Sequence, residues 1–269
     1  MSTREYTRCR TVDCGDYMRV NLYPVRPATK KRGAKKVPTS AVQSRLNAEN
    51  SAARLTDLIH ANFTPDDVAL HLTYRDDNKP ETVRDAQRMA YNYMRRLVRF
   101  WCKKTGAEKS EFKWIIVTEE SSTGRIHHHC LISGGLSIAE LSDKWGLGHT
   151  TTKALEFDET GLIGLATYIT KSRTSYRRWQ ASKNLAEPVV RENDYKIRKR
   201  DVRYIRDNPD DVWYIGKLHD GYAVCPGSVR VQRETEFGAG LFVSYMLYRV
   251  DSGSFYYDKN GVLRQKRKR

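Results

Sequence analysis

The chain has 269 residues, enough to bury a hydrophobic core and to form one domain with extensions or two small domains. Lysine and arginine number 48 against 32 aspartates and glutamates, and the formal charge of +16 indicates a polyanionic partner, nucleic acid before a membrane surface. No window holds the roughly 20 apolar residues of a spanning helix, and the first residues lack the apolar stretch of a secretory signal, so we expect a cytoplasmic protein with no membrane contact.

Two other classes of site are disfavoured by the sequence. The cysteines are odd in number and scattered, which predicts reduced thiols rather than a disulfide framework; they are Cys9, Cys14, Cys102, Cys130 and Cys225. Cys9 and Cys14 are spaced like half of a metal site, but no second pair follows. A GxxxxGK[ST] phosphate loop is absent from the sequence, so nothing indicates an ATP-driven helicase.

The first predicted elements are a basic connector and a helix. Lys30–Lys36 is flanked by prolines and is read as exposed, either a phosphate-binding arm or a solvated linker. A helix is predicted from Ala41 to about His60, followed by a strand over Val68–Tyr74. The strand places Val68, Leu70, Leu72 and Tyr74 on one face and Ala69, His71 and Thr73 on the other.

The clearest helical pattern runs from about Val83 to Lys104. Its apolar residues recur at three- and four-residue spacing, with Thr82 as the expected N-cap and Gly106 as the terminator. The other face is basic and is either simply solvated or in contact with DNA; it carries Arg84, Arg88, Arg95, Arg96, Arg99 and Lys103.

A hairpin follows the long helix. Its strands are Phe112–Glu119 and Arg125–Ile132, joined at the turn-forming Ser121–Gly124. Beyond it, the pattern predicts a capping box at Ser137 that opens a short helix ending before Gly146 or Gly148, a strand over Thr150–Phe157 and a helix from Thr160 to about Ser172. The C-terminal third has strand-like runs and a basic tail, at Val212–Leu218, Ser228–Gln232, Leu241–Val250 and Arg264–Arg269.

The hairpin carries candidate metal ligands. Side chains alternate along a strand, so His127 and His129 project together while His128 points to the opposite face. Two imidazoles on one face can hold a metal ion, although a His-Xaa-His also occurs by coincidence. Glu119 is the expected third ligand because it continues the face of Ile115 and Val117, and Glu120 would replace it if the register slipped by one residue.

The predicted helix after Gly161 carries a candidate nucleophile. Its core stripe leaves Tyr168 and Lys171 side by side at i and i+3. A tyrosine, with a reference pKa of about 10, attacks phosphorus well only when a metal or a cation favours its phenolate or offsets transition-state charge, and Lys171 would supply such a cation. Alone, the pair also fits a half-buried tyrosine beside a solvated lysine.

In order and spacing, the strand Leu70–Tyr74, the Glu119, His127 and His129 group, and the Tyr168 and Lys171 pair resemble the three motifs of HUH endonucleases. The chain is similar to rolling-circle replication initiators, the replication-associated proteins of small plasmids and phages of Gram-positive bacteria. The second motif corresponds to Gly124–His129 and the third to Tyr168–Lys171, and the similarity spans about Asn62 to Leu185, including Arg178-Trp179 and Ser182–Leu185.

The sequence departs from this pattern at two places. His71 stands where the first motif usually has a small or hydroxylated residue, and it is either an extra polar contact near the metal or a sheet residue. One motif tyrosine is present, because Tyr176 lies two helical turns on and lacks the i+4 pairing of two-tyrosine enzymes.

The resemblance implies an α+β fold, with a central antiparallel sheet flanked by helices as in RRM or ferredoxin-like folds. We expect a basic N-terminal extension over residues 1–61, the HUH endonuclease core over 62–185 and a C-terminal extension with a basic tail over 186–269.

The resemblance also implies a mechanism. Glu119, His127 and His129 would hold Mg²⁺ or Mn²⁺, and Tyr168 would attack the scissile phosphate of single-stranded DNA at a replication origin, giving a 5'-phosphotyrosine and a free 3' hydroxyl. Lys171 would stabilise charge on the phosphoryl group. Arg177, Arg178 and Trp179 would grip the DNA, although Trp179 also fits a core position. The expected partners are the host replication helicase and polymerase.

Two other functions fit the same residues. A relaxase or single-strand transposase performs the same cut, and the genetic surroundings of the gene would separate it from an initiator. A non-catalytic nucleic-acid-binding protein would keep the histidines as structural residues and would form no covalent adduct with DNA.

Overall fold

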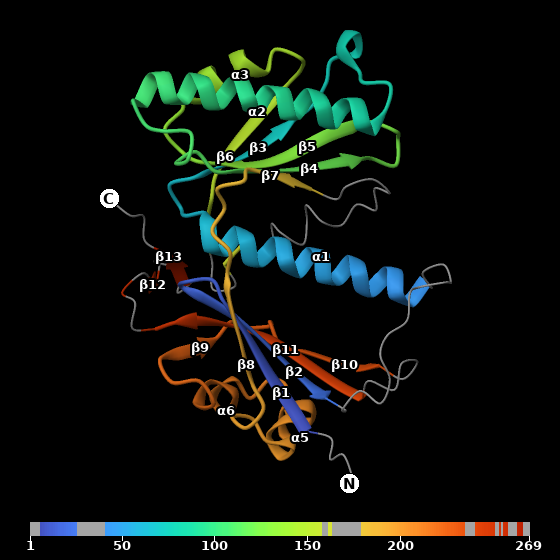
Figure 1. The fold of residues 1–269 in the computed structure, drawn as a ribbon, viewed down its shortest axis with the longest axis vertical. Coiled ribbons are helices and arrows are strands. Elements are labelled where there is room, and N and C mark those ends of the chain that lie inside the picture. Colours follow the sequence, from blue (N-terminus) through green and yellow to red (C-terminus); the bar gives the residue numbers. More distant parts are fainter. Residues whose placement is uncertain are drawn as a thin grey trace. The chain divides into compact units, whose positions relative to one another are not determined.

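The structure is a computed structural model that describes residues 6–25, 41–157, 161–162, 179–234, 240–250, 253, 255–257 and 263–265. The chain divides into two units (Figure 1). Unit 1 draws on Met1–Ala61, Asp158–Gly161 and Glu187–Arg264, and unit 2 on Asn62–Phe157, Leu162–Ala186 and Gln265–Arg269. Sequence-distant segments therefore fold together in unit 1, which the sequence patterns did not predict.

Unit 2 is built on an antiparallel sheet in the order β6-β3-β5-β4-β7. Its strands are β3 (Val68–Leu72), β4 (Trp114–Glu120), β5 (Ile126–Ile132), β6 (Thr150–Ala154) and β7 (Gln180–Ala181). A short 3₁₀ turn, η1 (Asp76–Asn78), follows β3. The hairpin of β4 and β5 is confirmed, and the antiparallel sheet with its helices confirms the α+β class.

Two helices, α2 (Val83–Thr105) and α3 (Ile138–Trp145), cover one face of this sheet (Figure 1). The expected caps are confirmed: the Thr82 side chain accepts from the Asp85 N–H, Gly106 ends α2 at φ 74°, and Ser137 and Glu140 form the capping box of α3. The core between helices and sheet contains Leu70, Leu72, Trp114, Ile116, Cys130, Ile132, Tyr93, Met94, Leu97, Trp101, Leu141 and Trp145. Burial of this face leaves the opposite face of the sheet to the candidate site.

Unit 1 contains a second antiparallel sheet, in the order β10-β11-β2-β1-β8 with β9 paired to β11. Its strands are β1 (Tyr6–Asp13), β2 (Tyr17–Val25), β8 (Val189–Asn193), β9 (Tyr222–Val224), β10 (Arg230–Glu234) and β11 (Gly240–Arg249). A separate two-stranded sheet joins β12 (Phe255–Tyr257) and β13 (Leu263–Gln265). The two N-terminal strands thus lie between strands that come from the C-terminal third of the chain.

Helices pack on both faces of the unit 1 sheet (Figure 1). On one face, α5 (Lys199–Asp207) and α6 (Val212–Lys217) bury Val202, Ile205 and Ile215 against strand residues such as Val20 and Leu22. On the other, α1 (Ala41–Asn62) is joined to β2 by Arg19, whose guanidinium donates to both carboxylate oxygens of Asp57 at 2.9 and 2.6 Å.

The predicted helix over Ala41–His60 is confirmed as α1, and the predicted strands at Ser228–Gln232 and Leu241–Val250 are confirmed as β10 and β11. The predicted strand over Val212–Leu218 is wrong, because this segment is helix α6. Its β-branched and aromatic residues suggested a strand, but the Asp211 carboxylate caps the helix by accepting from the Tyr214 N–H at 2.9 Å. The connector at 30–36, the helix over 160–172 apart from residues 161–162, and the tail beyond 265 lie outside the described residues.

A buried histidine of unit 1 gives a testable pH dependence. His219 is 1% exposed, and burial together with the charge of Lys196 lowers its pKa to about 4, while its Nε2 lies 2.7 Å from the Tyr245 hydroxyl. Since an unfolded histidine titrates at about 6.5, the unfolded state binds more protons between these values. The contribution of His219 to stability is therefore complete above about pH 6.5 and is lost as the pH falls towards about 4.

A His219→Gln variant keeps a polar partner for Tyr245 but cannot titrate. We expect the fall in unfolding free energy with acid to be shallower than in the wild type by up to about 1.4 kcal/mol per pH unit in that window. Urea denaturation followed by circular dichroism at several pH values measures this slope. Identical slopes in the two proteins would contradict the assignment.

Candidate metal centre

The open face of the unit 2 sheet brings together four side chains from three strands. Antiparallel pairing sets His71 of β3 opposite His129 of β5, and Glu119 of β4 opposite His127 of β5. Directly paired residues project to the same side of a sheet, so three imidazoles and one carboxylate converge. We call His71, His127, His129 and Glu119 the His/Glu cluster.

The distances within the His/Glu cluster suit a metal site. Ligand nitrogens of the three histidines lie within 4.8 Å of one another. The Glu119 carboxylate oxygen Oε2 lies 3.2 Å from His127 Nε2 and 3.3 Å from His129 Nε2. Donors bound to one divalent cation lie about 2.0 to 2.3 Å from it and hence about 3 to 4 Å from one another, so a small closure would let all four reach a common ion.

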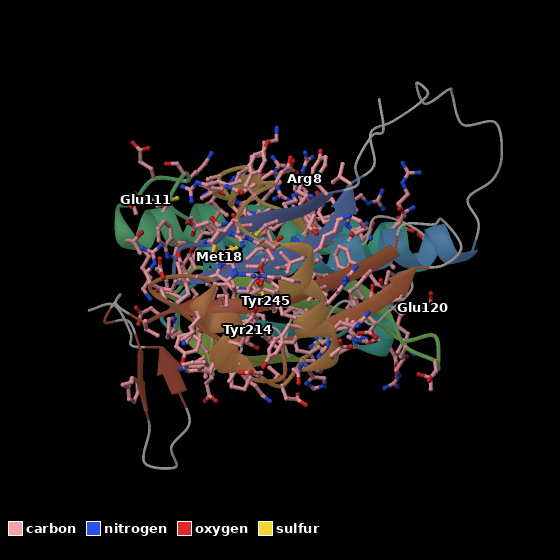
Figure 2. The ribbon with its side chains drawn as sticks, turned by 90° about the horizontal axis from the view of Figure 1, so that it is seen from below. Arg8, Met18, Glu111, Glu120, Tyr214 and Tyr245 are labelled. Atoms are coloured by element: carbon pink, nitrogen blue, oxygen red, sulfur yellow. The ribbon has the colours of Figure 1, made fainter. Side chains whose placement is uncertain are left out.

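The cluster answers the alternatives that the sequence left open. Glu119, not Glu120, lies beside the histidines: Glu120 pairs with Ile126 and is exposed at the end of β4 (Figure 2). His71 is more than a sheet residue, because its ring centroid lies 5.0 Å from that of His127 and 4.9 Å from that of His129. The placement of His71 needed the order of strands in the sheet, which no local pattern supplies.

The surroundings favour neutral imidazoles. Burial lowers the pKa of His129 to about 4, with further lowering from the neighbouring histidines, and burial followed by the charge of His127 lowers the pKa of His71. A neutral imidazole has a free lone pair, which is the form that binds a metal. At neutral pH these two histidines are therefore ready to bind a cation without first losing a proton.

His128 anchors the strand between two members of the cluster. As predicted, it points to the other face, where it is fully buried. Its Nε2 lies 2.7 Å from the Tyr74 hydroxyl and its Nδ1 lies 3.0 Å from the Thr118 hydroxyl. Both ring nitrogens are thus partnered by residues that adjoin β5 in the sheet, which fixes the β5 backbone where it presents His127 and His129.

The other predicted site residues are divided by what the structure describes. Tyr168, Lys171, Arg177 and Arg178 lie outside the described residues. Trp179 is partly buried and directly precedes β7, which pairs with β4 at the edge of the sheet. The segment after β7 is held to the sheet, since Ser182 Oγ accepts from the Trp114 N–H and the Asn184 side chain donates to the carbonyls of Ser110 and Phe112.

A His71→Ala substitution tests whether His71 belongs to the metal site. Imidazole ligands favour Mn²⁺ over Mg²⁺, so we expect the variant to bind Mn²⁺ at least about tenfold more weakly and to prefer Mn²⁺ less strongly. Isothermal titration calorimetry with each ion measures both quantities. His149→Ala is the matched control, because His149 is exposed and outside the cluster. Equal Mn²⁺ affinity in the His71 variant and the wild type would exclude His71 as a ligand.

The comparison with protein families gives a match over the segment that holds the site. Residues 67–173 match the family model described as replication-associated protein ORF2, a span that starts just before β3 and includes the whole His/Glu cluster. Neither the curated proteins nor the solved structures contain a match to the chain. In the part of the chain that is described, no helix is both long and apolar enough to cross a membrane.

Proposed function

Since residues 67–173 place the chain in the replication-associated protein ORF2 family, we propose that it initiates rolling-circle replication by nicking and rejoining single-stranded DNA at an origin. The family itself supports a role in starting DNA replication. The nicking step is our inference, and the observation that carries it is the convergence of the His/Glu cluster on the open face of the unit 2 sheet. We assign the nuclease to the segment 62–185.

The donor set of the cluster fits a divalent cation with imidazole and carboxylate ligands, and Mn²⁺ suits three imidazoles better than Mg²⁺ does. When bound, the ion supplies positive charge that polarises a phosphoryl oxygen of the DNA. His71, His127, His129 and Glu119 come from three paired strands, so the sheet holds them in a fixed arrangement.

We assign the nucleophile to Tyr168. Its hydroxyl oxygen forms a bond to phosphorus, the bond from phosphorus to the 3' oxygen breaks, and the departing 3' oxygen takes up a proton to become a hydroxyl. The 5' phosphate stays on the tyrosine, so its bond energy is retained for rejoining. Lys171, one helical turn from Tyr168 in the predicted helix, would offset negative charge on the phosphoryl group.

The free 3' hydroxyl is a primer, which makes a host polymerase and helicase the expected partners of the reaction. Arg177, Arg178 and Trp179 follow the nucleophile in sequence and are proposed to hold the DNA through phosphate contacts and base stacking. This reading favours an initiator over a relaxase or transposase, since the matched family is named for replication.

The test is a cleavage assay on single-stranded oligonucleotides that tile the candidate origin of the element carrying the gene. We expect Mn²⁺-dependent cleavage of one strand at one position, leaving a fragment that a polymerase can extend from its 3' end and a second fragment that stays with the protein after denaturation. Cleavage should stop in EDTA and return when Mn²⁺ is restored. Binding of the strands without cleavage in Mn²⁺ would leave a non-catalytic DNA-binding protein instead.

A further inference from the structure

Unit 1 carries a dense group of cations at and before α5. The sequence from Tyr195 to Arg203 contains five basic residues and one acidic residue, Asp201; the basic residues are Lys196, Arg198, Lys199, Arg200 and Arg203. All five basic side chains are exposed, whereas Asp201 is buried. The acidic side chain therefore adds little negative charge to the outer surface, and the segment presents a concentrated positive charge.

The packing of α5 fixes the direction of these cations. Val202 and Ile205 are buried in the core of unit 1, which turns Lys199, Arg200 and Arg203 to the opposite side of the helix. Asp201 is held from within: its Oδ1 accepts from the Tyr214 hydroxyl at 2.9 Å and its Oδ2 accepts from the Arg198 N–H at 2.9 Å. The charged face is thus a rigid part of unit 1.

Exposed aromatic side chains accompany the cations. Tyr195 is 90% exposed and Trp213 of α6 is 68% exposed, values far above those of the buried tryptophans of unit 2. The Lys217 ammonium lies 3.3 Å from the centre of the Trp213 ring, so this indole is already bordered by a cation. Exposed large aromatics are costly to solvate and mark a surface that another molecule covers.

The two helices form one surface. Tyr204 of α5 packs on Tyr214 of α6 with ring centroids 4.1 Å apart, and the Tyr204 hydroxyl donates to the Asp211 carboxylate at 2.8 Å. Both helices lie on the same face of the sheet, and Figure 2 views unit 1 from that side, with Tyr214 labelled. We call Tyr195, Lys199, Arg200, Arg203 and Trp213 the α5–α6 surface.

We propose that the α5–α6 surface is a second binding site for single-stranded DNA, separate from the His/Glu cluster. Cations that follow a backbone, together with exposed rings on which unpaired bases stack, are the chemistry of a single-strand site. A duplex would use the cations but would leave the rings unsatisfied, because its bases are already stacked on one another. The site would hold the strand by its backbone and bases without reading its sequence, and it does not depend on nicking.

The experiment measures binding of the full chain to a fluorescein-labelled oligothymidylate of about 16 nucleotides in EDTA, where a metal-dependent cut cannot occur. The test variant is Lys199→Gln, Arg200→Gln, Arg203→Gln. The matched control is Arg84→Gln, Arg95→Gln, Arg99→Gln, which removes the same charge from exposed positions of α2. We expect the α5 variant to bind at least about tenfold more weakly, with a salt dependence lower by about two units, and the α2 variant to change little.

Trp213→Ala separates stacking from charge. We expect a loss of about 5- to 100-fold in affinity for the oligothymidylate, no change in salt dependence, little change for a duplex of equal length, and recovery with Trp213→Phe. Circular dichroism checks that each variant is folded. Equal losses in the α5 and α2 variants, or a Trp213 variant that binds single strands as the wild type does, would overturn the proposal. Since no nicking is involved, these results stand whether or not the chain cleaves DNA.

Discussion

A Tyr168→Phe variant is expected to form no covalent adduct with DNA and to lose nicking by about four orders of magnitude or more. The substitution removes one oxygen atom and keeps the aromatic ring, so the packing of the predicted helix should be preserved. If Tyr168 is the nucleophile, no other group can form the bond to phosphorus, and the residual rate is that of attack by water. A denaturing gel with a labelled origin strand and Mn²⁺ measures both the adduct and the cut.

Tyr176→Phe is the matched control for this prediction, because Tyr176 lies in the same part of the chain, two helical turns beyond the proposed nucleophile. It should retain adduct formation. The Tyr168 variant should also keep the wild-type affinity for the uncut strand, since it lacks only the reacting oxygen. Unchanged nicking by Tyr168→Phe would remove this tyrosine from the mechanism while leaving the metal centre in question untouched.

Loss of the two β5 histidines is expected to have the second large effect. In His127→Ala, His129→Ala the cluster keeps His71 and Glu119, which come from two different strands. We expect Mn²⁺ affinity to fall by more than about 100-fold and nicking to fall with it. Calorimetric titration with Mn²⁺, followed by cleavage assays over a range of Mn²⁺ concentrations, connects the two losses.

The control for the histidine variant is its fold. The cluster side chains face away from the core of unit 2, where His128 makes the buried hydrogen bonds that hold β5, so the double variant should remain folded. A comparison of thermal unfolding without metal checks this. A folded double variant that nicks DNA at the wild-type rate in Mn²⁺ would show that the cluster plays no part in cleavage.

The local part of this site could be predicted from the sequence, because alternation along a strand and a short hairpin turn are nearest-neighbour properties. They placed His127 and His129 on one face and Glu119 beside them. His71 could not be assigned in this way, since its position depends on β3 pairing with β5 across a long stretch of intervening chain. A sequence pattern gives the face of a strand, but its neighbours follow from the topology of the whole sheet.

The same limit explains unit 1. The pairing of β1 with β8 joins Cys9 to Asn193, and β2 pairs with β11, contacts that no local pattern can indicate. The long helix α2 was predictable from end to end because its apolar stripe and both caps are local. In contrast, α6 has only six residues, too few to separate a helical from an extended apolar run, and its cap at Asp211 decided the outcome.

The central claim is that Tyr168 becomes covalently linked to DNA. The most direct measurement is mass spectrometry of the peptide that carries the DNA, after wild-type protein reacts with an origin strand in Mn²⁺ and is digested with trypsin and a nuclease. We predict a nucleotide on the peptide that contains Tyr168, attached through its phenolic oxygen. A nucleotide on another residue, such as Tyr176, or cleaved DNA with no modified peptide, would contradict the account.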